Sequence, residues 1–193
     1  MMEIREIMAD TGMEVMSMKE AGIIADPEEN GSTFEENALI KVREVAKLAR
    51  ERGYSDAYIV ADDSGLEIDC LNKEPGIYSA RYLGRDTSYR VKNNDLIRRT
   101  NETNDPDRVC RFVCAIAAVF PDGSEHVVRG IIEGVVADKE YGINGFGFDP
   151  IFYVPEFGCT TAELSPEAKN ACSHRGNALR LLKKEICDYK IGE

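Results

Sequence analysis

Two adjacent carboxylates, Asp62 and Asp63, follow the apolar segment Tyr58 to Ala61 and precede Ser64 and Gly65. Adjacent side chains on a strand point to opposite faces, so one carboxylate can face a site while the other accepts backbone amides. Carboxylate oxygens suit magnesium and a metal-bridged phosphate, and the same group can act as a general base. An isolated pair of this kind is usually a solvated strand end, so its interpretation depends on further motifs.

Glu28 and Glu29 lie in the acidic loop Ala25 to Gly31, ahead of a long amphipathic segment. Either glutamate could bring a second carboxylate to a metal bound by Asp63, because magnesium takes hard oxygen ligands. Without Asp63 the two glutamates would be interpreted as a solvated charge run. Both are therefore candidate metal ligands, and the choice between them stays open.

The loop Gly145 to Pro150 combines glycine, aromatic and acidic residues. Gly147 lets the backbone approach a ligand closely, and Phe146 or Phe148 offers a ring that could stack on a planar base. Asp149 adds an acid beside them. Such loops are also common in hairpins, so this motif alone favours a binding and a structural interpretation equally.

The start of the last predicted helix carries Ser173, His174, Arg175 and Gly176. Free amides and the positive end of the helix dipole favour an anionic or carbonyl acceptor at such a position. Lys169, one short turn upstream, adds a cation. Ser173 could equally serve as a helix cap, and the two roles are compatible.

Hydrophobic periodicity predicts the elements that must position these groups. A capping box at Ser32 and Glu35 marks the start of the longest helix. Strands are expected at Met13 to Met18, on either side of an acidic turn at Tyr58 to Ala61 and Leu66 to Ile68, and in a hairpin of Arg111 to Phe120 and Glu125 to Ala137. Helices are expected at Met1 to Gly12, Thr33 to Arg52, Tyr89 to Thr100, from Ser165, and at His174 to Cys187.

Composition limits the class of protein. The 193 residues carry a net charge of -11, which argues against a duplex nucleic-acid binder because such proteins need a cationic surface. The sequence has 43% hydrophobic residues, enough for a core in a single domain over residues 1–193. No signal peptide or membrane-spanning run is apparent, and the six cysteines form no CxxC pair. These features predict a cytoplasmic protein with reduced thiols and no membrane partner.

Five motifs in series resemble one family, the inosine/xanthosine triphosphate pyrophosphatases of the Ham1 type. The match covers essentially the whole chain in the family's order. The motifs are Thr33-Phe34-Glu35-Glu36-Asn37-Ala38, Ala61-Asp62-Asp63-Ser64-Gly65-Leu66, Pro75-Gly76-Ile77-Tyr78-Ser79-Ala80-Arg81-Tyr82, Gly145-Phe146-Gly147-Phe148-Asp149-Pro150-Ile151-Phe152 and Ser173-His174-Arg175-Gly176.

This resemblance implies an α/β fold with a long curved mixed sheet between two helical lobes, and a homodimer. It implies Mg²⁺-dependent hydrolysis of non-standard purine nucleoside triphosphates (ITP, dITP and XTP) to monophosphate and pyrophosphate. Asp63 would be the general base and a metal ligand, with Glu28 or Glu29 as the second acid. The substrate would contact Ser64, Phe146, Gly147, Phe148, Asp149, Lys169, His174 and Arg175.

The chain departs from the family pattern at its N-terminus. The family opens with a short strand and a phosphate-binding loop of the form Ser/Thr-x-Asn-x-x-Lys, whereas Met1 here already begins a helical pattern. The absence of that loop would weaken triphosphate binding. A non-catalytic nucleotide-binding protein is therefore the alternative from a different class, and a pyrophosphatase for modified pyrimidines is a third hypothesis.

Overall fold

The computed structural model describes residues 1–192, which form two compact units. The first unit comprises Met1–Asp63, Cys114–Gly130 and His174–Glu193, and the second comprises Ser64–Val113 and Ile131–Ser173. The helices are α1 (Met2–Met8), α2 (Phe34–Glu51), α3 (Tyr89–Thr103), α4 (Pro166–Cys172) and α5 (His174–Gly192). The strands, whose order in the sheet follows the chain, are β1 (Ile59–Ile68), β2 (Val109–Val119), β3 (Glu125–Val136), β4 (Phe152–Val154) and β5 (Cys159–Thr160).

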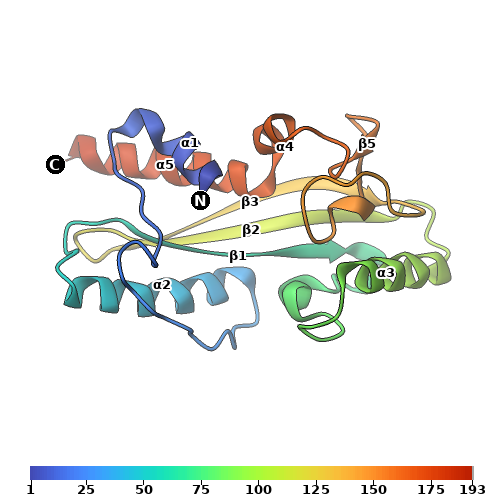
Figure 1. Ribbon diagram of the computed structural model, residues 1–193, viewed down its shortest axis with the longest axis horizontal. Coiled ribbons are helices and arrows are strands. Elements are labelled where there is room, and N and C mark those ends of the chain that lie inside the picture. The colour runs from blue at the N-terminus through green and yellow to red at the C-terminus, as the bar shows by residue number, and fades with distance from the viewer. Residues whose placement is uncertain (193) are drawn as a thin grey trace. The chain divides into compact units, whose positions relative to one another are not determined.

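In the first unit, α5 and α2 cover opposite faces of the strands, and α1 packs against α5 (Figure 1). The apolar stripe of α2 is buried because its members recur at helical spacing. Those members are Phe34, Ala38, Val42, Val45, Ala46 and Ala49. The core on the α5 side includes Met8, Cys114, Ile116, Phe120, Leu179, Leu182 and Ile186.

In the second unit, a separate core forms around the remaining halves of the long strands. It includes Leu66, Ile68, Leu96, Ile97, Phe112, Phe148, Ile151 and Phe152. The short strand β4 pairs antiparallel with β3, with Val135 opposite Tyr153, and β5 pairs antiparallel with β4. In Figure 1, α3 lies on the opposite side of these strands from α4.

Most elements agree with the sequence pattern. The α/β class, the long α2 helix and the β2–β3 hairpin are confirmed. The hairpin turn closes with a hydrogen bond from the Phe120 amide to the Ser124 carbonyl, at 3.0 Å. Ser165 caps α4, since its hydroxyl accepts from the Ala168 amide at 3.2 Å.

The prediction of an acidic turn between two short strands is wrong. Strand β1 runs without interruption from Ile59 to Ile68, and Asp62 and Asp63 lie inside it. The carboxylates can stay within the sheet because Arg175 bonds Asp62 and Lys41 bonds Asp63. These partners offset part of the desolvation cost that would otherwise favour placing an acidic pair in a turn.

Two smaller expectations are also wrong. Met13 to Met18 is irregular rather than a strand, and the Val15 carbonyl accepts from the Arg5 side chain at 3.1 Å. The N-cap of α2 is Thr33 instead of Ser32, because the Thr33 hydroxyl accepts from the Glu36 amide at 3.1 Å. The Glu36 side chain in turn accepts from the Ser32 amide, so the capping interactions use Thr33 and Glu36 instead of Ser32 and Glu35.

Within the described residues, no helix is both long and apolar enough to cross a bilayer.

Candidate active site

Asp63 is the most deeply buried of the predicted site acids in the first unit, with 8% of its surface exposed. Its Oδ1 accepts from the Lys41 Nζ at 2.9 Å, and its Oδ2 accepts from the Asn37 Nδ2 at 3.3 Å. Burial raises the pKa of the Asp63 carboxyl above its ordinary value, while the bond from Lys41 opposes that rise. A buried carboxylate whose pKa is raised is a better proton acceptor than a solvated one.

Both partners of Asp63 come from one face of α2, where Asn37 and Lys41 lie one helical turn apart. Asn37 is fully buried within the apolar stripe of that helix. Sequence reasoning overlooked the pair, although a polar residue at a buried helical position is a recognisable signal. The start of α2 at Thr33 fixes which helical face these two side chains occupy.

Glu29 lies beside the group formed by Asp63, Asn37 and Lys41, whereas Glu28 does not. The Lys41 Nζ lies 3.5 Å from the Glu29 Oε1, so one ammonium group bridges Glu29 and Asp63. The side chain of Glu28 is exposed. Within the described residues, no group of three or more His, Cys, Asp or Glu side chains is arranged to hold a metal.

Asp62 faces the other side of β1 and binds Arg175 at the start of α5. The Arg175 Nη2 donates to the Asp62 Oδ2 at 2.8 Å, and its Nε donates to the same oxygen at 3.3 Å. The prediction that adjacent acids point to opposite faces, with Asp62 in a structural role, agrees with this geometry. His174 and Arg175 both lie in the first turn of α5, as predicted.

Gly130 lets β3 approach the beginning of α5. A Cβ atom at this position would lie 2.2 Å from the His174 carbonyl oxygen and 2.4 Å from the Ala178 amide nitrogen. These contacts are with backbone, which cannot move aside without shifting the helix. Gly130 therefore helps to place the end of α5 that carries Arg175.

Asp149 organises the aromatic loop of the second unit, although it is almost fully buried. Its Oδ2 accepts from the Phe146 amide at 2.7 Å and from the Lys169 ammonium, and its Oδ1 accepts from the Thr161 hydroxyl at 2.8 Å. Gly145 adopts a positive φ of 74°, and a Cβ atom there would lie 2.2 Å from Asp149. The glycine is thus required by close approach within the loop.

The two phenylalanines of this loop have different environments. Phe146 is 72% exposed, and the Lys169 Nζ lies 5.0 Å from its ring centre. Phe148 is buried in the core and packs edge-to-face against Tyr89, with ring centres 5.3 Å apart. Of these two phenylalanines, Phe146 is therefore the one whose ring a ligand could stack on.

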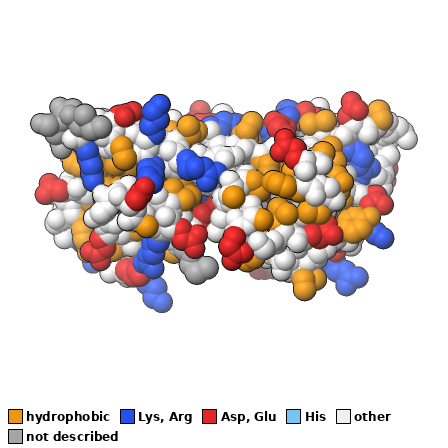
Figure 2. All heavy atoms as spheres, turned by 90° about the horizontal axis from the view of Figure 1, so that it is seen from above, with side chains coloured by type: hydrophobic (Ala, Val, Ile, Leu, Met, Phe, Trp, Pro, Cys, Tyr) orange, Lys and Arg blue, Asp and Glu red, His pale blue; other side chains and the backbone are white. Residues whose placement is uncertain are grey.

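Hydrophobic side chains gather on the surface of the second unit over α4 and β5 (Figure 2). Between β3 and α4, the exposed large hydrophobic side chains are those of Tyr141, Ile143, Phe146 and Phe157. Ser64, the remaining predicted contact, is half-buried in β1. Of the predicted residues, Asp63 and Glu29 thus form an acidic group in the first unit, and Phe146, Asp149 and Lys169 form an aromatic group in the second. Arg175 instead binds Asp62 on the other face of β1.

Known proteins resemble this chain over most of its length. A sequence profile described as the Ham1 family matches residues 1–185. A dITP/XTP pyrophosphatase from Clostridium perfringens is 44% identical over 184 residues, covering 95% of this chain and 90% of the relative. One from Bacillus anthracis is 40% identical over 193 residues, covering 99% of this chain and 93% of the relative.

Solved structures of Ham1 proteins are also similar to this chain. A HAM1 protein from Coxiella burnetii is 38% identical and superposes with a TM-score of 0.87, covering 97% of this chain and 92% of the other. The Ham1 protein of Staphylococcus aureus is 42% identical and superposes with a TM-score of 0.84, with the same coverage of 97% and 92%.

Proposed function

Because the chain belongs to the Ham1 family, we propose that it hydrolyses non-standard purine nucleoside triphosphates (ITP, dITP and XTP) to the monophosphate and pyrophosphate. The names of its relatives support the substrate class, since they are dITP/XTP pyrophosphatases. The observation that carries the proposal is Asp63, a buried carboxylate held by Lys41 and Asn37. Such a group is positioned to activate water.

In the proposed reaction, Asp63 accepts a proton from a water molecule whose oxygen attacks the α-phosphorus. The bond from that phosphorus to the oxygen bridging to the β-phosphate breaks, and pyrophosphate leaves with the bonding electrons. Burial raises the pKa of Asp63, which strengthens it as a base, and the hydrogen bond and charge of Lys41 favour its ionised form. Asn37 restricts the carboxylate to one orientation.

The donor chemistry of Asp63 and Glu29 suits Mg²⁺, because both supply hard oxygen atoms and both already converge on a cation, the Lys41 ammonium. These two residues would hold the metal. When bound, magnesium would neutralise charge on the triphosphate and on the leaving pyrophosphate. Glu28 is exposed and is the weaker candidate.

Other residues are proposed to select the nucleobase of the substrate. Phe146 offers the exposed ring for stacking, and Lys169 and Asp149 fix the loop that carries it. Inosine and xanthosine present a 6-oxo acceptor where adenosine has an amino donor. Donors such as Arg175 and the amides near His174 would therefore favour them, since a buried donor facing an amino group loses its hydrogen bond.

We also propose that the protein acts as a homodimer in the cytoplasm, where nucleotide pools are maintained. This part rests on the membership of the chain in the Ham1 family. Size-exclusion chromatography with light scattering checks the oligomeric state. A mass near the 21.5 kDa of one chain would contradict the dimer.

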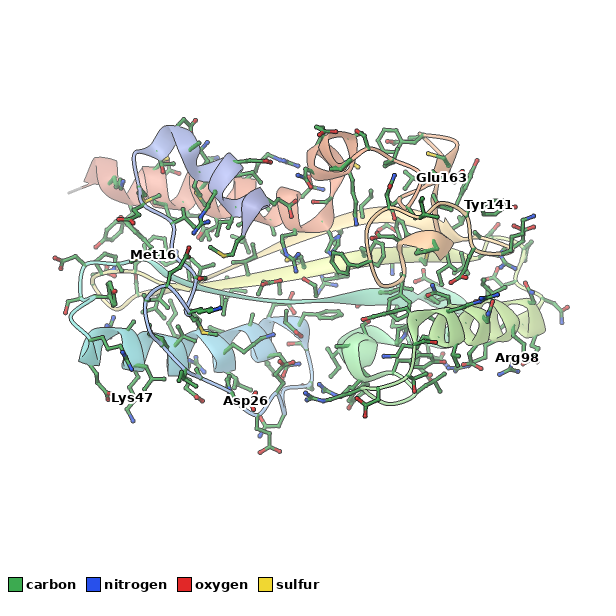
Figure 3. All side chains as sticks on the ribbon, in the orientation of Figure 1. Met16, Asp26, Lys47, Arg98, Tyr141 and Glu163 are labelled. Carbon is green, nitrogen blue, oxygen red and sulfur yellow. The ribbon has the colours of Figure 1, made fainter. Side chains whose placement is uncertain are left out.

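Pyrophosphate release from dITP, XTP, dGTP and ATP in the presence of Mg²⁺ tests the activity. We expect rapid turnover of dITP and XTP, and a loss of about 10²- to 10⁴-fold in kcat for Asp63→Asn, the range expected for a general base. Asp26→Asn is the matched control, because Asp26 is exposed in the loop before α2 (Figure 3). Equal rates for wild type and Asp63→Asn would exclude the assigned base.

A further inference from the structure

Asn93 on α3 is buried beside the aromatic loop, with 1% of its surface exposed. Its Nδ2 donates to the Glu140 Oε1 at 2.7 Å and to the Gly147 carbonyl at 3.3 Å. One side-chain amide thus joins the helix, the segment leading into the loop and the centre of the loop itself. Neither the Asp63 group nor the Asp149 group uses this residue.

The chemistry of the two partners requires a hydrogen-bond donor at position 93. A carboxylate and a carbonyl can only accept hydrogen bonds, so the Asn93 NH₂ group must face both of them. The Asn93 Oδ1 is buried and lacks a hydrogen-bond partner in the described structure. Retaining an orphaned acceptor carries a cost of desolvation, which the two donated bonds must offset.

Neighbouring residues of α3 support the same loop. Tyr89, one turn before Asn93, packs edge-to-face on Phe148, and its ring lies 3.5 Å from where a Cβ atom of Gly147 would be. Lys92 is buried, donates to the Ala80 carbonyl at 2.9 Å and lies 4.9 Å from the Tyr89 ring centre. The buried face of α3 therefore packs under the loop on the side where Phe148 enters the core.

The loop needs this support because glycine confers little rigidity. Gly145 and Gly147 both have positive φ values, of 74° and 68°, and such residues are free to adopt many conformations before folding. The Phe146 amide is fixed by Asp149, whereas the carbonyl of Gly147 is fixed by Asn93. The ring of Phe146 thus lies between two hydrogen-bonded anchors.

We propose that Asn93 is a positioning residue for base selection. By holding the Gly147 carbonyl and Glu140, it fixes the backbone on which the exposed Phe146 ring is mounted. The inference rests on the proposed function, because the nucleobase of the substrate is taken to contact this loop. Asn93 acts through the loop and contributes nothing to the activation of water.

The test uses Asn93→Asp, which preserves size but replaces the donor with an acceptor and places a second negative charge against Glu140. We expect the ratio of kcat/KM for dITP over dGTP to fall about 10-fold or more, mainly through KM, because two buried bonds are lost. Asn94→Asp is the matched control, since Asn94 is the next residue of α3 and is exposed. It adds the same charge without touching the loop and should leave the ratio unchanged.

The double variant Asn93→Asp with Glu140→Gln separates positioning from general damage. The new glutamine donates where the new aspartate accepts, so the bond returns with reversed polarity and part of the discrimination should be recovered. Circular dichroism and the melting temperature check that each variant folds. A fall in kcat/KM that is equal for dITP and dGTP, or no recovery in a folded double variant, would overturn the proposal.

Calorimetric binding of dIMP and dGMP to the same variants keeps this proposal separate from the catalytic one. If wild type binds dIMP without hydrolysing dITP, the proposed hydrolysis fails while the binding ratio still tests Asn93. Loss of the dIMP preference in Asn93→Asp alone supports the inference. An unchanged preference rejects it, and the pyrophosphate assay decides the proposed hydrolysis independently.

Discussion

Replacing Lys41 by methionine should destabilise the first unit and impair the proposed base together. The side chains of Lys41 and Asp63 are 20% and 10% exposed, so the pair is largely withdrawn from water. Removing one partner of a buried ion pair costs about 3–5 kcal/mol, and the residual exposure of Lys41 favours the lower end. At about 2–4 °C per kcal/mol for a chain of this size, the melting temperature should fall by about 6–12 °C.

The pH dependence of the same variant tests the electrostatic part of the reasoning. Burial already raises the pKa of Asp63, the Lys41 bond lowers it and Glu29 raises it slightly. Without the ammonium, burial and the neighbouring carboxylate are opposed by the Asn37 hydrogen bond alone among these causes, so the pKa of Asp63 must rise further. The acid limb of kcat/KM for dITP should therefore move to higher pH in Lys41→Met, because the base must be ionised to act.

Lys47→Met provides the control for this experiment. Lys47 lies on the same helix, is exposed and points away from the sheet (Figure 3), so the change removes an identical charge without touching Asp63. Its melting temperature and acid limb should match those of wild type. If Lys41→Met also kept both the wild-type melting temperature and the wild-type acid limb, the assignment of Lys41 as the cation that holds Asp63 would be refuted.

Three further predictions concern neighbouring residues. Glu29→Gln should raise the magnesium concentration needed for half-maximal pyrophosphate release, whereas Glu28→Gln should leave it unchanged; equal effects would contradict the assignment of Glu29. Gly130→Ala should cost about 3 kcal/mol in urea unfolding, because its Cβ would lie 2.2 Å from a carbonyl oxygen of α5, and a neutral result would mean that the helix shifts freely. Because the native pKa of Asp63 is raised above its unfolded value, its contribution favours folding at acid pH and is lost as pH rises through the native pKa. The free energy of unfolding of Asp63→Asn, measured in urea across this pH range, should lack that decline. Parallel pH profiles for wild type and Asp63→Asn would contradict the raised pKa of Asp63.

Local patterns predicted those parts of the fold that local interactions determine. The stripe from Phe34 to Ala49 is periodic over 4 helical turns, so burial of that face requires no knowledge of its partner. Likewise, the apolar β2 segment and the turn at Asp122 and Gly123 contain enough information to specify a hairpin. The capping of α4 by Ser165 depends only on its own next three residues.

Long-range partners explain the errors. An acidic pair favours a turn unless cations reach it, and the cations here are Lys41, 22 residues away from Asp63, and Arg175, 113 residues away from Asp62. Similarly, the alternating segment at Met13 to Met18 would need a neighbouring strand, whereas the Val15 carbonyl is bound by a side chain of α1. Local propensities cannot predict contacts between residues so far apart in sequence, because these contacts depend on the tertiary fold.

The continuity of β1 bears directly on how the carboxylates are divided between two roles. Had the acids lain in a turn, both could have faced one site, and their mutual repulsion would have raised one pKa at the expense of the other. Within a strand they cannot share a site, because successive side chains point to opposite faces. Asp62 is therefore committed to Arg175 at the start of α5, and Asp63 alone is left with Lys41, Asn37 and the neighbouring Glu29. A swap of function between the two acids would require β1 to slip by one residue, which would also reverse the burial of Leu66 and Ile68.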